Sequence, residues 1–492
     1  MAIGDGDCHP ICKRNMDKNK LIKLLVAILA FLVLWFLPAD CFGMADLTTI
    51  EHRVIAIFVF GALMWILEPI PIWTTSIGII VLMILTVSDS MFAPLKDVAD
   101  PLFGTLISHR SIMASFADPI IMLFMGGFAL AIGATKVGLD VNLARVLLKP
   151  FGNKSEIVLL GFMLVTAVFS MFMSNTATAA MMLAIIAPVL AQLPLEGKGR
   201  IAMALGVPIA ANVGGIGTPI GTPPNAIALR YLSEHEELGV HIGFGDWMAA
   251  MVPIMLLVLA FSWFILLKLF PFTKKQITFD IQGKFRTDTQ ALVVYITFAV
   301  TVVLWLSDSI TGINSNCVAM IPLAVFAVTG VMGKKELQEI NWDVLWLVAG
   351  GFALGVGLSG SGLAKHMVAS IPFETWPPFA VLLGSGFICY LMSTFMSNTA
   401  SAALLIPILA AIATGMGDVL GAFGGAETML IGVALCASFA MALPISTPPN
   451  ALAYATGVMK QSEMARSGVL IGVFGMIVGY LMLFGAVKLG IL

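Results

Sequence analysis

The sequence predicts an all-α polytopic membrane protein with about 11 transmembrane helices, arranged as two inverted repeats. Three observations support this prediction. Of the 492 residues, 59% are hydrophobic and only 11% are charged, whereas a soluble domain carries roughly 25% charged residues. Apolar runs long enough to cross a bilayer recur along the whole chain. One nine-residue stretch also occurs twice, which indicates an internal duplication.

The N-terminal end and the first repeat can be delimited from these runs. We expect a cytosolic N-terminal tail over residues 1–20, because several basic residues precede the first apolar run. That run is long enough to span, so a first transmembrane helix and its loop are expected over 21–50. The first repeat is expected over 51–271. Its scaffold helices accompany a re-entrant hairpin at 156–193 and a broken helix at 201–232, where Gly and Pro interrupt the apolar pattern.

The second half of the chain repeats this plan. A cytosolic linker with four basic residues is expected over 272–290, and the second repeat over 291–492. The second repeat contains a hairpin at 378–412 and a broken helix at 428–458. The two GGFAL segments are 224 residues apart, the two Ser-Asn-Thr triplets 223 and the two Thr-Pro-Pro-Asn segments 225. Each repeat has an odd number of crossings, so the two copies are expected to be inverted.

The distribution of Lys and Arg predicts the orientation in the membrane. With a cytosolic N-terminus and eleven crossings, 20 of the 26 Lys and Arg residues fall on the inner side and six on the outer side. We therefore expect a multi-pass protein of the cell membrane with a cytoplasmic N-terminus and an external C-terminus. The first hairpin would then open toward the cytosol and the second toward the exterior, so that their tips meet near the midplane.

The duplicated stretch, Phe172–Ala180 and Phe395–Ala403, is identical at eight of nine positions. Each copy places a Ser-Asn-Thr triplet between two apolar runs, where its polar groups are costly unless they find partners. A single triplet of this kind is more often a helix-packing contact than a ligand site. The duplication, with a Thr-Pro-Pro-Asn segment after each copy, predicts two half-sites that face one ligand, and therefore a membrane transporter.

The residue types in these segments predict an anion and Na⁺ as ligands. The first N–H groups and the positive dipole end of each second hairpin helix favour an anion such as a carboxylate. The prolines of the broken helices leave carbonyl oxygens exposed, and carbonyl, hydroxyl and amide oxygens together suit Na⁺. No Lys, Arg, Asp or Glu lies in either hairpin tip or either break. We therefore expect Na⁺, and neither a protein cation nor a proton, to accompany the anion.

Other patterns in the sequence argue against further functions. The GGFAL segments Gly126–Leu130 and Gly350–Leu354 are interpreted as closely packed helix surfaces. Gly355–Gly360 matches a nucleotide-loop pattern, but no strand precedes it and it lies in an apolar run of lipid length. No Ser, His and acid group form a convincing triad, and no basic stretch is interleaved with aromatic residues. We expect neither enzymatic activity nor a nucleic-acid partner, and no continuous polar stripe indicates a channel.

The two triplets, the two Thr-Pro-Pro-Asn segments and the repeat order resemble the divalent anion:sodium symporter family, from about residue 50 to the end. That family includes Na⁺-coupled dicarboxylate and citrate transporters. The resemblance implies a homodimer in which a transport domain moves against a scaffold domain in an elevator-type cycle. Exchanger branches tend to lose one triplet or one Pro-Pro-Asn, and this chain keeps all four. The four retained motifs therefore favour symport. The family resemblance implies an anionic substrate, which we expect to be a C4-type dicarboxylate (succinate, malate or fumarate). Dicarboxylate or citrate exchange and sulfate-type symport remain alternatives.

The same resemblance implies a set of site residues. Those expected to contact the substrate carboxylates or to line their pocket are Ser174, Asn175, Thr176, Ser397, Asn398, Thr399, Thr222, Pro223, Thr447 and Pro448. One Na⁺ site would use Ser170, Asn175 and the backbone near Gly221. The other Na⁺ site would use Ser393, Asn398 and the backbone near Ser446.

Overall fold

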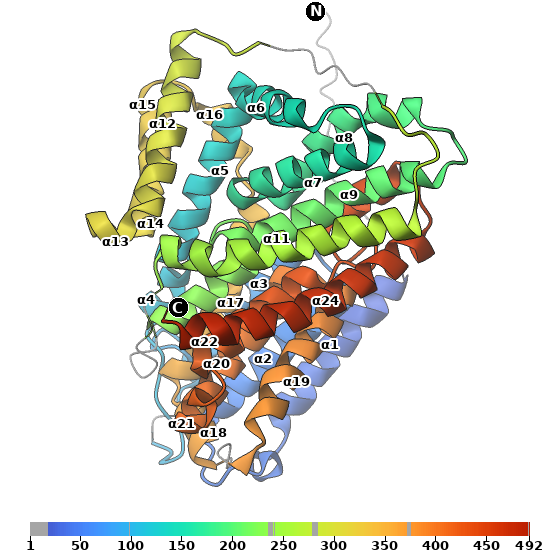
Figure 1. Ribbon diagram of the computed structural model, residues 1–492. Helices are drawn as coiled ribbons and strands as arrows, with labels where there is room; N and C mark the ends of the chain where they lie inside the picture. Colours follow the sequence, from blue (N-terminus) through green and yellow to red (C-terminus); the bar gives the residue numbers. More distant parts are fainter. Residues whose placement is uncertain are drawn as a thin grey trace, which may run out of the picture.

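A computed structural model describes residues 18–97, 99–234, 240, 242–277, 284–370, 375–490 and 492 of the chain. These residues form a bundle of helices in which no strand longer than an isolated bridge occurs among the described segments (Figure 1). The predicted all-α class is confirmed. The predicted tail lies almost entirely outside the described residues, and the first helix begins at Lys18, inside the last residues of that tail.

The helices of the first half follow in this order: α1 (Lys18–Phe36), α2 (Thr49–Leu67), α3 (Ile72–Val87), α4 (His109–Ala114), α5 (Pro119–Val137), α6 (Leu139–Leu148), α7 (Ser155–Phe172), α8 (Asn175–Gln192), α9 (Lys198–Gly214), α10 (Pro223–Glu234) and α11 (Phe244–Leu269). Short 3₁₀ turns lie between them: η1 (Ala39–Phe42), η2 (Ala93–Leu95), η3 (Ser115–Ala117), η4 (Lys149–Phe151) and η5 (Gly215–Gly217). The pair α7–α8 is the first hairpin, and α9 and α10 are the two parts of the first broken helix.

The helices of the second half are α12 (Thr289–Leu306), α13 (Asp308–Thr311), α14 (Ser315–Val318), α15 (Met320–Val328), α16 (Lys334–Gln338), α17 (Trp342–Gly360), α18 (Leu363–Ser370), α19 (Pro378–Phe395), α20 (Asn398–Met416), α21 (Asp418–Gly421), α22 (Gly425–Phe439), α23 (Pro448–Ala455) and α24 (Gln461–Lys488). The pair α19–α20 is the second hairpin, and α22 and α23 form the second broken helix. The helices from α17 to α24 thus follow the same plan as the helices from α5 to α11. The last helices of the two halves, α11 and α24, lie side by side (Figure 1).

Many of these helices are long and apolar enough to cross a bilayer. Twelve such helices occur among the described residues, and four of them are the hairpin helices α7, α8, α19 and α20. Three further crossings that the sequence predicts correspond to shorter apolar helices, at Ile72–Val87, Ser315–Val328 and Gly425–Phe439. The protein is therefore a multi-pass membrane protein. Helix α1 is the most exposed of the twelve, with one buried residue, Ala27, as expected of a helix that faces lipid.

The two GGFAL segments are closely packed, as predicted. A Cβ atom at Gly126 in α5 would overlap the backbone carbonyl of Ala319, at the junction of α14 and α15. A Cβ atom at Gly350 in α17 would overlap the side chain of Ser76 in α3. Small residues allow helix backbones to approach one another in a membrane. These contacts hold α5 and α17 firmly in place, and both helices reach the cavity described below.

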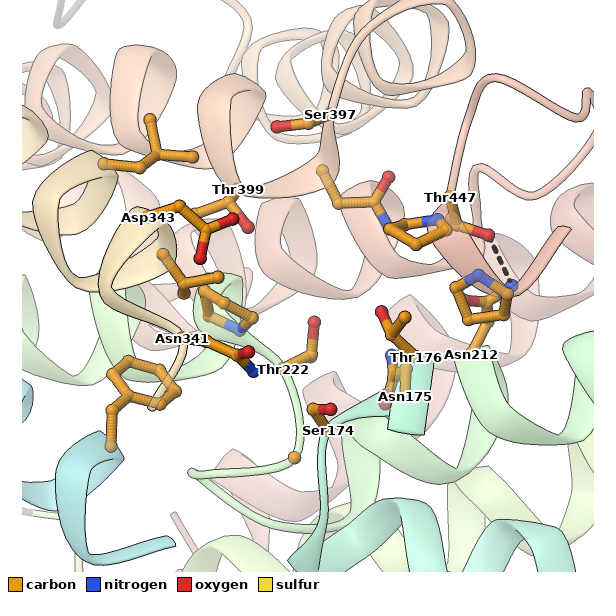
Figure 2. Close-up of a pocket in the computed structure, with 18 of the residues that line it drawn as sticks. Ser174, Asn175, Thr176, Asn212, Thr222, Asn341, Asp343, Ser397, Thr399 and Thr447 are labelled. Atoms are coloured by element: carbon orange, nitrogen blue, oxygen red, sulfur yellow. Dashed lines mark hydrogen bonds between the residues drawn. The ribbon is translucent and has the colours of Figure 1, made fainter. Parts of the chain in front are cut away.

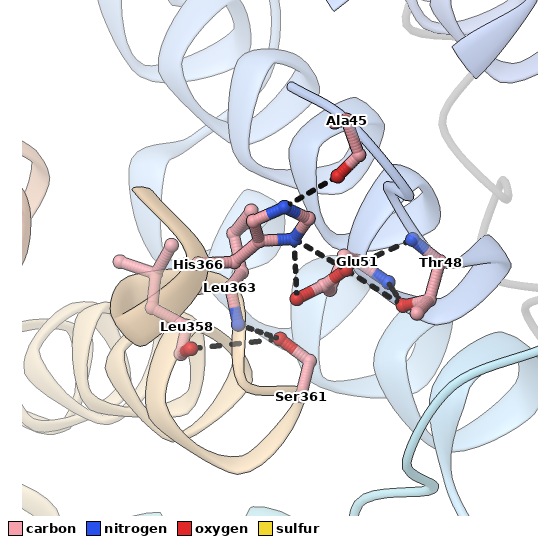
Figure 3. Close-up of polar contacts among 7 residues, drawn as sticks. All are labelled: Ala45, Thr48, Glu51, Leu358, Ser361, Leu363 and His366. Carbon is pink, nitrogen blue, oxygen red and sulfur yellow. Dashed lines mark hydrogen bonds and ion pairs between the residues drawn. The ribbon is translucent and has the colours of Figure 1, made fainter. Parts of the chain in front are cut away.

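A polar cluster joins α18 to the start of α2 (Figure 3). Thr48 caps α2, and the Glu51 carboxylate accepts hydrogen bonds from the Thr48 backbone N–H at 2.9 Å and from its hydroxyl at 2.8 Å. His366 Nδ1 lies 3.1 Å from the same carboxylate, and its Nε2 lies 2.8 Å from the Ala45 carbonyl oxygen. The short helix that precedes the second hairpin is therefore tied to a helix of the first half.

A buried ion pair fastens the second part of the first broken helix. Arg230 Nε on α10 donates to Asp118 Oδ2 at 2.6 Å, and both side chains are less than 10% exposed. Asp118 also caps α5, because its other oxygen accepts from the Ile120 backbone N–H at 2.9 Å. The Arg230 guanidinium lies 3.9 Å from the ring centroid of Phe352 in α17. One buried cation therefore links α10 to both α5 and α17.

Candidate substrate and sodium site

Each Ser-Asn-Thr triplet forms the turn between the two helices of a hairpin. In the first hairpin, Ser174 is the N-cap of α8, and its hydroxyl oxygen accepts from the Ala177 backbone N–H at 3.2 Å. In the second, Ser397 caps α20 and accepts from the Ala400 N–H at 3.1 Å. Ser is a preferred N-cap because its oxygen satisfies a backbone donor that lacks an intrahelical partner. The serine O–H and the remaining first-turn N–H groups stay available for an anion.

Both triplets line one cavity of about 240 Å³ (Figure 2). Ser174, Asn175 and Thr176 lie on one side of it, and Ser397 and Thr399 lie on the opposite side. All ten residues predicted to contact the substrate line this cavity: Ser174, Asn175, Thr176, Ser397, Asn398, Thr399, Thr222, Pro223, Thr447 and Pro448. Pockets for drug-sized ligands measure roughly 300–1,000 Å³, so this cavity suits a smaller molecule.

The breaks in the two broken helices are shaped by their Thr-Pro-Pro-Asn segments. The prolines occupy the first turn of α10 and of α23, where a missing N–H is tolerated, so the irregular backbone precedes them. Asn225 Nδ2 donates to the carbonyls of Gly215 at 3.0 Å and Thr218 at 2.8 Å. Asn450 Nδ2 donates to the carbonyls of Met441 at 2.8 Å and Leu443 at 3.0 Å. Each asparagine therefore holds the loop that precedes its own helix.

Asn212 connects the two broken helices to each other. Its Nδ2 on α9 lies 3.1 Å from the Thr447 hydroxyl oxygen and 3.2 Å from Asn450 Oδ1 (Figure 2 shows the former bond). Sequence reasoning did not single out Asn212. The available signal was an isolated amide within an apolar half-helix, where a polar side chain requires a partner. The roles of Asn225 and Asn450 were also missed, although both belong to the duplicated segments.

Behind the first tip, the three residues predicted for one Na⁺ site come together. Ser170 Oγ lies 2.6 Å from Asn175 Oδ1 and 2.7 Å from the Ala211 carbonyl oxygen. With the Asn175 amide turned over, its nitrogen would donate to the Gly221 carbonyl at 3.1 Å and to the Ala211 carbonyl at 3.3 Å. In that orientation the amide nitrogen also donates to Ser170 Oγ at 2.6 Å, so four oxygen-bearing groups converge and are already hydrogen-bonded. A cation bound among these oxygens would take the place of those hydrogen bonds.

Behind the second tip, the corresponding oxygens lack strong partners. Ser393 Oγ and Asn398 Oδ1 are buried, and neither has a nitrogen or oxygen partner within the described ranges. Ser393 has only the neighbouring thiol of Cys389, which is a weak partner. Ser446 Oγ donates to the Thr394 carbonyl at 2.7 Å, next to Ser393. Buried oxygens without partners are costly, so this set also fits a cation with oxygen ligands.

The sequence has no acidic residue in the hairpin tips or the breaks, but the cavity that they line also contains one acidic residue from another helix. Asp343, in the first turn of α17, lines the cavity together with Asn341 (Figure 2). The cavity lining also includes the largely apolar side chains of Ile72, Trp73, Phe124, Phe128, Val344 and Leu347. Asp343 was missed because the sequence does not show that the start of α17 faces the hairpin tips. Among the residues that line the cavity in the described chain, none is Lys, Arg or His.

Comparison with known proteins identifies the family. The family model of the sodium:sulfate symporter transmembrane region matches residues 18–489. The chain belongs to this family. The predicted resemblance to the divalent anion:sodium symporters is thereby confirmed. The chain is 32% identical over 484 residues to an uncharacterized transporter of Haemophilus influenzae, a match that covers 94% of this chain and 95% of the relative.

Two further relatives of this symporter-family chain carry functional names. The sodium-dependent dicarboxylate transporter SdcS of Staphylococcus aureus is 28% identical over 515 residues, covering 96% of this chain and 92% of the relative. The inorganic phosphate transporter PHO87 of Saccharomyces cerevisiae is 29% identical over 429 residues, covering 86% of this chain and 45% of the relative. Relatives at this level of identity therefore carry names for different anions.

Solved structures support the fold of the symporter family member. The Alcanivorax borkumensis YdaH transporter matches with a TM-score of 0.53 at 15% identity, covering 77% of this chain and 88% of that one. The Neisseria gonorrhoeae MtrF structure matches with a TM-score of 0.51 at 11% identity, covering 84% and 94% respectively. At such identities the similarity concerns the arrangement of helices alone.

Proposed function

We propose that this protein is a secondary active transporter that carries a C4-type dicarboxylate into the cell together with Na⁺. The observation that carries the proposal is that both Ser-Asn-Thr triplets line one small cavity that has no Lys, Arg or His in its described lining. Each triplet lies at the start of a helix, where the first N–H groups have no intrahelical partner and favour an anion. Two anion-binding ends that face each other suit a short molecule with a carboxylate at each end.

The substrate carboxylates would be held by neutral donors. Ser174 and Thr176 serve one carboxylate, and Ser397 and Thr399 serve the other, each assisted by the N-terminus of its helix. A hydrogen bond to a charged group is worth roughly 1.5–3 kcal/mol, and a helix N-terminus adds about 0.3–1 kcal/mol. Thr222 and Thr447 line the cavity between the tips, where their hydroxyls can face the middle of the substrate.

Coupling to Na⁺ follows from the oxygens behind each tip. Asn175 belongs both to the first triplet and to the oxygen set with Ser170 and Gly221. In the second triplet, Asn398 has a buried oxygen without a nitrogen or oxygen partner among the described residues, and so does Ser393. Each amide can turn its oxygen toward Na⁺ and its nitrogen toward a carboxylate. Binding of Na⁺ therefore orients the donor that the substrate requires. The sodium-dependent dicarboxylate transporter SdcS, similar over 96% of this chain, supports this assignment.

The transport cycle and assembly belong to the same proposal. The protein would act as a homodimer in the cell membrane, with a cytoplasmic N-terminus and an external C-terminus. The hairpins and broken helices would move together against the scaffold helices in an elevator-type motion. Cysteines introduced at Lys274 and Asp308 test the orientation, since the first should react only from the cytosol and the second only from outside. Reaction of both from outside would exclude the inverted arrangement.

Uptake into liposomes tests the activity. Purified protein is reconstituted, and radiolabelled succinate uptake is measured with an inward Na⁺ gradient, with K⁺ replacing Na⁺, and with the proton gradient collapsed. Uptake should require Na⁺ and persist without a proton gradient. Uptake that ignores Na⁺ but requires dicarboxylate inside the liposome would instead identify an exchanger. Unlabelled sulfate and phosphate are included as competitors, because the family description names sulfate and one relative is named for phosphate.

A further inference from the structure

Asp343 is the one charged residue in the described lining of the cavity. It lies two residues after Asn341, the residue that precedes α17, and its side chain is exposed. No described side chain pairs with its carboxylate in an ion pair, whereas Asp118, at the start of α5, is paired with Arg230. The carboxylate therefore faces, without an ionic partner among the described residues, a space that two anion-binding helix ends also share (Figure 2).

An acidic residue in the first turn of a helix commonly has a simpler role. Its charge complements the positive end of the helix dipole and adds a fraction of the helix's stability. Asp288 precedes α12, and Asp246 lies in the first turn of α11. Neither of these lines the cavity. Among the described acidic residues, Asp343 combines this helix position with a place in the cavity lining, so its charge also acts on whatever the cavity holds.

The effect of that charge depends on the number of charges on the ligand. A dianion with one carboxylate at each triplet is held at both ends by neutral donors. A third carboxylate projects from between these ends into a cavity whose other polar side chains include Thr222, Thr447 and Asn341, all neutral, and the acidic Asp343. The neutral groups can donate hydrogen bonds to it, but no Lys, Arg or His in the described lining offsets the added repulsion from Asp343.

We propose that Asp343 sets the charge selectivity of the cavity by rejecting trianions such as fully ionised citrate in favour of dianions. This inference rests on the proposed function and narrows its substrate class to dianions. Asp343 acts as a specificity-determining residue and is not needed to hold either carboxylate of the favoured substrate. Its removal should therefore broaden selectivity without abolishing uptake.

The test compares Asp343→Asn with wild type and with two controls. Glu339→Gln removes the same charge four residues earlier, from an exposed residue outside the cavity lining. Asp343→Glu keeps the charge. Inhibition of succinate uptake by citrate is measured at a pH at which citrate is fully ionised. Asp343→Asn should shift the citrate-to-succinate affinity ratio about tenfold toward citrate, which corresponds to about 1.4 kcal/mol. Glu339→Gln and Asp343→Glu should stay near the wild-type ratio.

A binding measurement keeps this inference separate from the transport proposal. The heat stability of the purified protein is measured in NaCl with succinate or with citrate. The stabilisation by each ligand gives the same affinity ratio without transport. If wild type takes up no succinate, the proposed function fails, while the ratio from heat stabilisation still decides the role of Asp343. An unchanged ratio in Asp343→Asn overturns the inference. An equal shift in Glu339→Gln also overturns it, because general surface charge would then be the cause.

Discussion

The two halves of the cavity differ in how their buried oxygens are bonded. In the first half, Ser170 is already hydrogen-bonded to Asn175 and to the Ala211 carbonyl. At the matching positions of the second half, the buried oxygens of Ser393 and Asn398 have no nitrogen or oxygen partner in the described chain. Each of these pairs lies within or just before one copy of the duplicated nine-residue stretch, and the two copies differ at one position. A duplicated motif therefore does not produce two equal sites. A cation entering the first half must replace existing hydrogen bonds, while in the second half it satisfies oxygens that lack strong partners. We expect Na⁺ to bind more tightly in the second half.

The largest expected effect comes from a charge placed at either triplet. Asn175→Asp and Asn398→Asp keep an oxygen for Na⁺ but lose the amide donor and set a carboxylate against the substrate. A like-charge contact in a site with little water costs several kcal/mol. Both variants should abolish dicarboxylate uptake at every Na⁺ concentration. Reconstituted variants in Na⁺-gradient liposomes provide the measurement, and wild-type rates in either one would place the substrate elsewhere.

The next largest effect is expected in the Na⁺ dependence of uptake, and it distinguishes the two halves of the cavity. Ser393→Ala should raise the Na⁺ concentration for half-maximal succinate uptake about tenfold, a loss within the 1–3 kcal/mol range of a buried polar ligand. Ser170→Ala should raise it only about threefold, because Ser170 gives up hydrogen bonds when Na⁺ binds. Excess Na⁺ should restore uptake in both. Equal shifts, or a larger shift in Ser170→Ala, would contradict the proposed difference between the halves.

A smaller effect is expected from the asparagines that hold the two breaks. Asn450 binds two loop carbonyls and also accepts from Asn212, whereas Asn225 binds loop carbonyls of its own break. Asn450→Ala should therefore lower the melting temperature more than Asn225→Ala, because it removes one further hydrogen bond, which contributes about 1 kcal/mol of stability. Thermal unfolding in detergent measures this. When each substitution is combined with Asn212→Ala, the two should lower the melting temperature equally. A difference that persists in that background would assign the larger loss of stability to another contact.

The smallest expected effect concerns the dependence of stability on pH. It arises at a contact between the two halves of the chain, outside the cavity. The hydrogen bond with Glu51 raises the pKa of His366, with a smaller opposing effect of burial, and Asp46 raises it further. Because the folded protein holds this proton more tightly, the stabilisation is complete below the ordinary pKa of about 6.5. This stabilisation is lost as pH rises through the raised pKa of His366 in the folded protein. Thermal unfolding across this range should show a small decline in wild type that is absent in His366→Gln, and parallel profiles would exclude the contact as its source.

Much of the fold follows from the sequence because lipid leaves few alternatives. Apolar runs must form helices, and the Gly-rich and Pro-rich interruptions must lie where other parts of the protein can satisfy their backbone. The motif repeat then pairs Ser174 with Ser397 and Thr222 with Thr447, and all four line the same cavity. What the sequence could not show were contacts that depend on helix arrangement. Asp343 and Asn212 carry no repeated pattern, and only the packing of α17 and α9 brings them to the cavity.

The buried pair of Arg230 and Asp118 has a consequence for the temperature at which the protein works. Any cycle that separates α10 from α5 must bring both charges into water or supply new partners, and breaking a buried pair costs roughly 3–5 kcal/mol when one charge stays uncompensated. Such a step gives the conformational exchange a large activation energy. Turnover should therefore fall steeply on cooling and depend little on ionic strength, since a pair this deeply buried is poorly screened by salt.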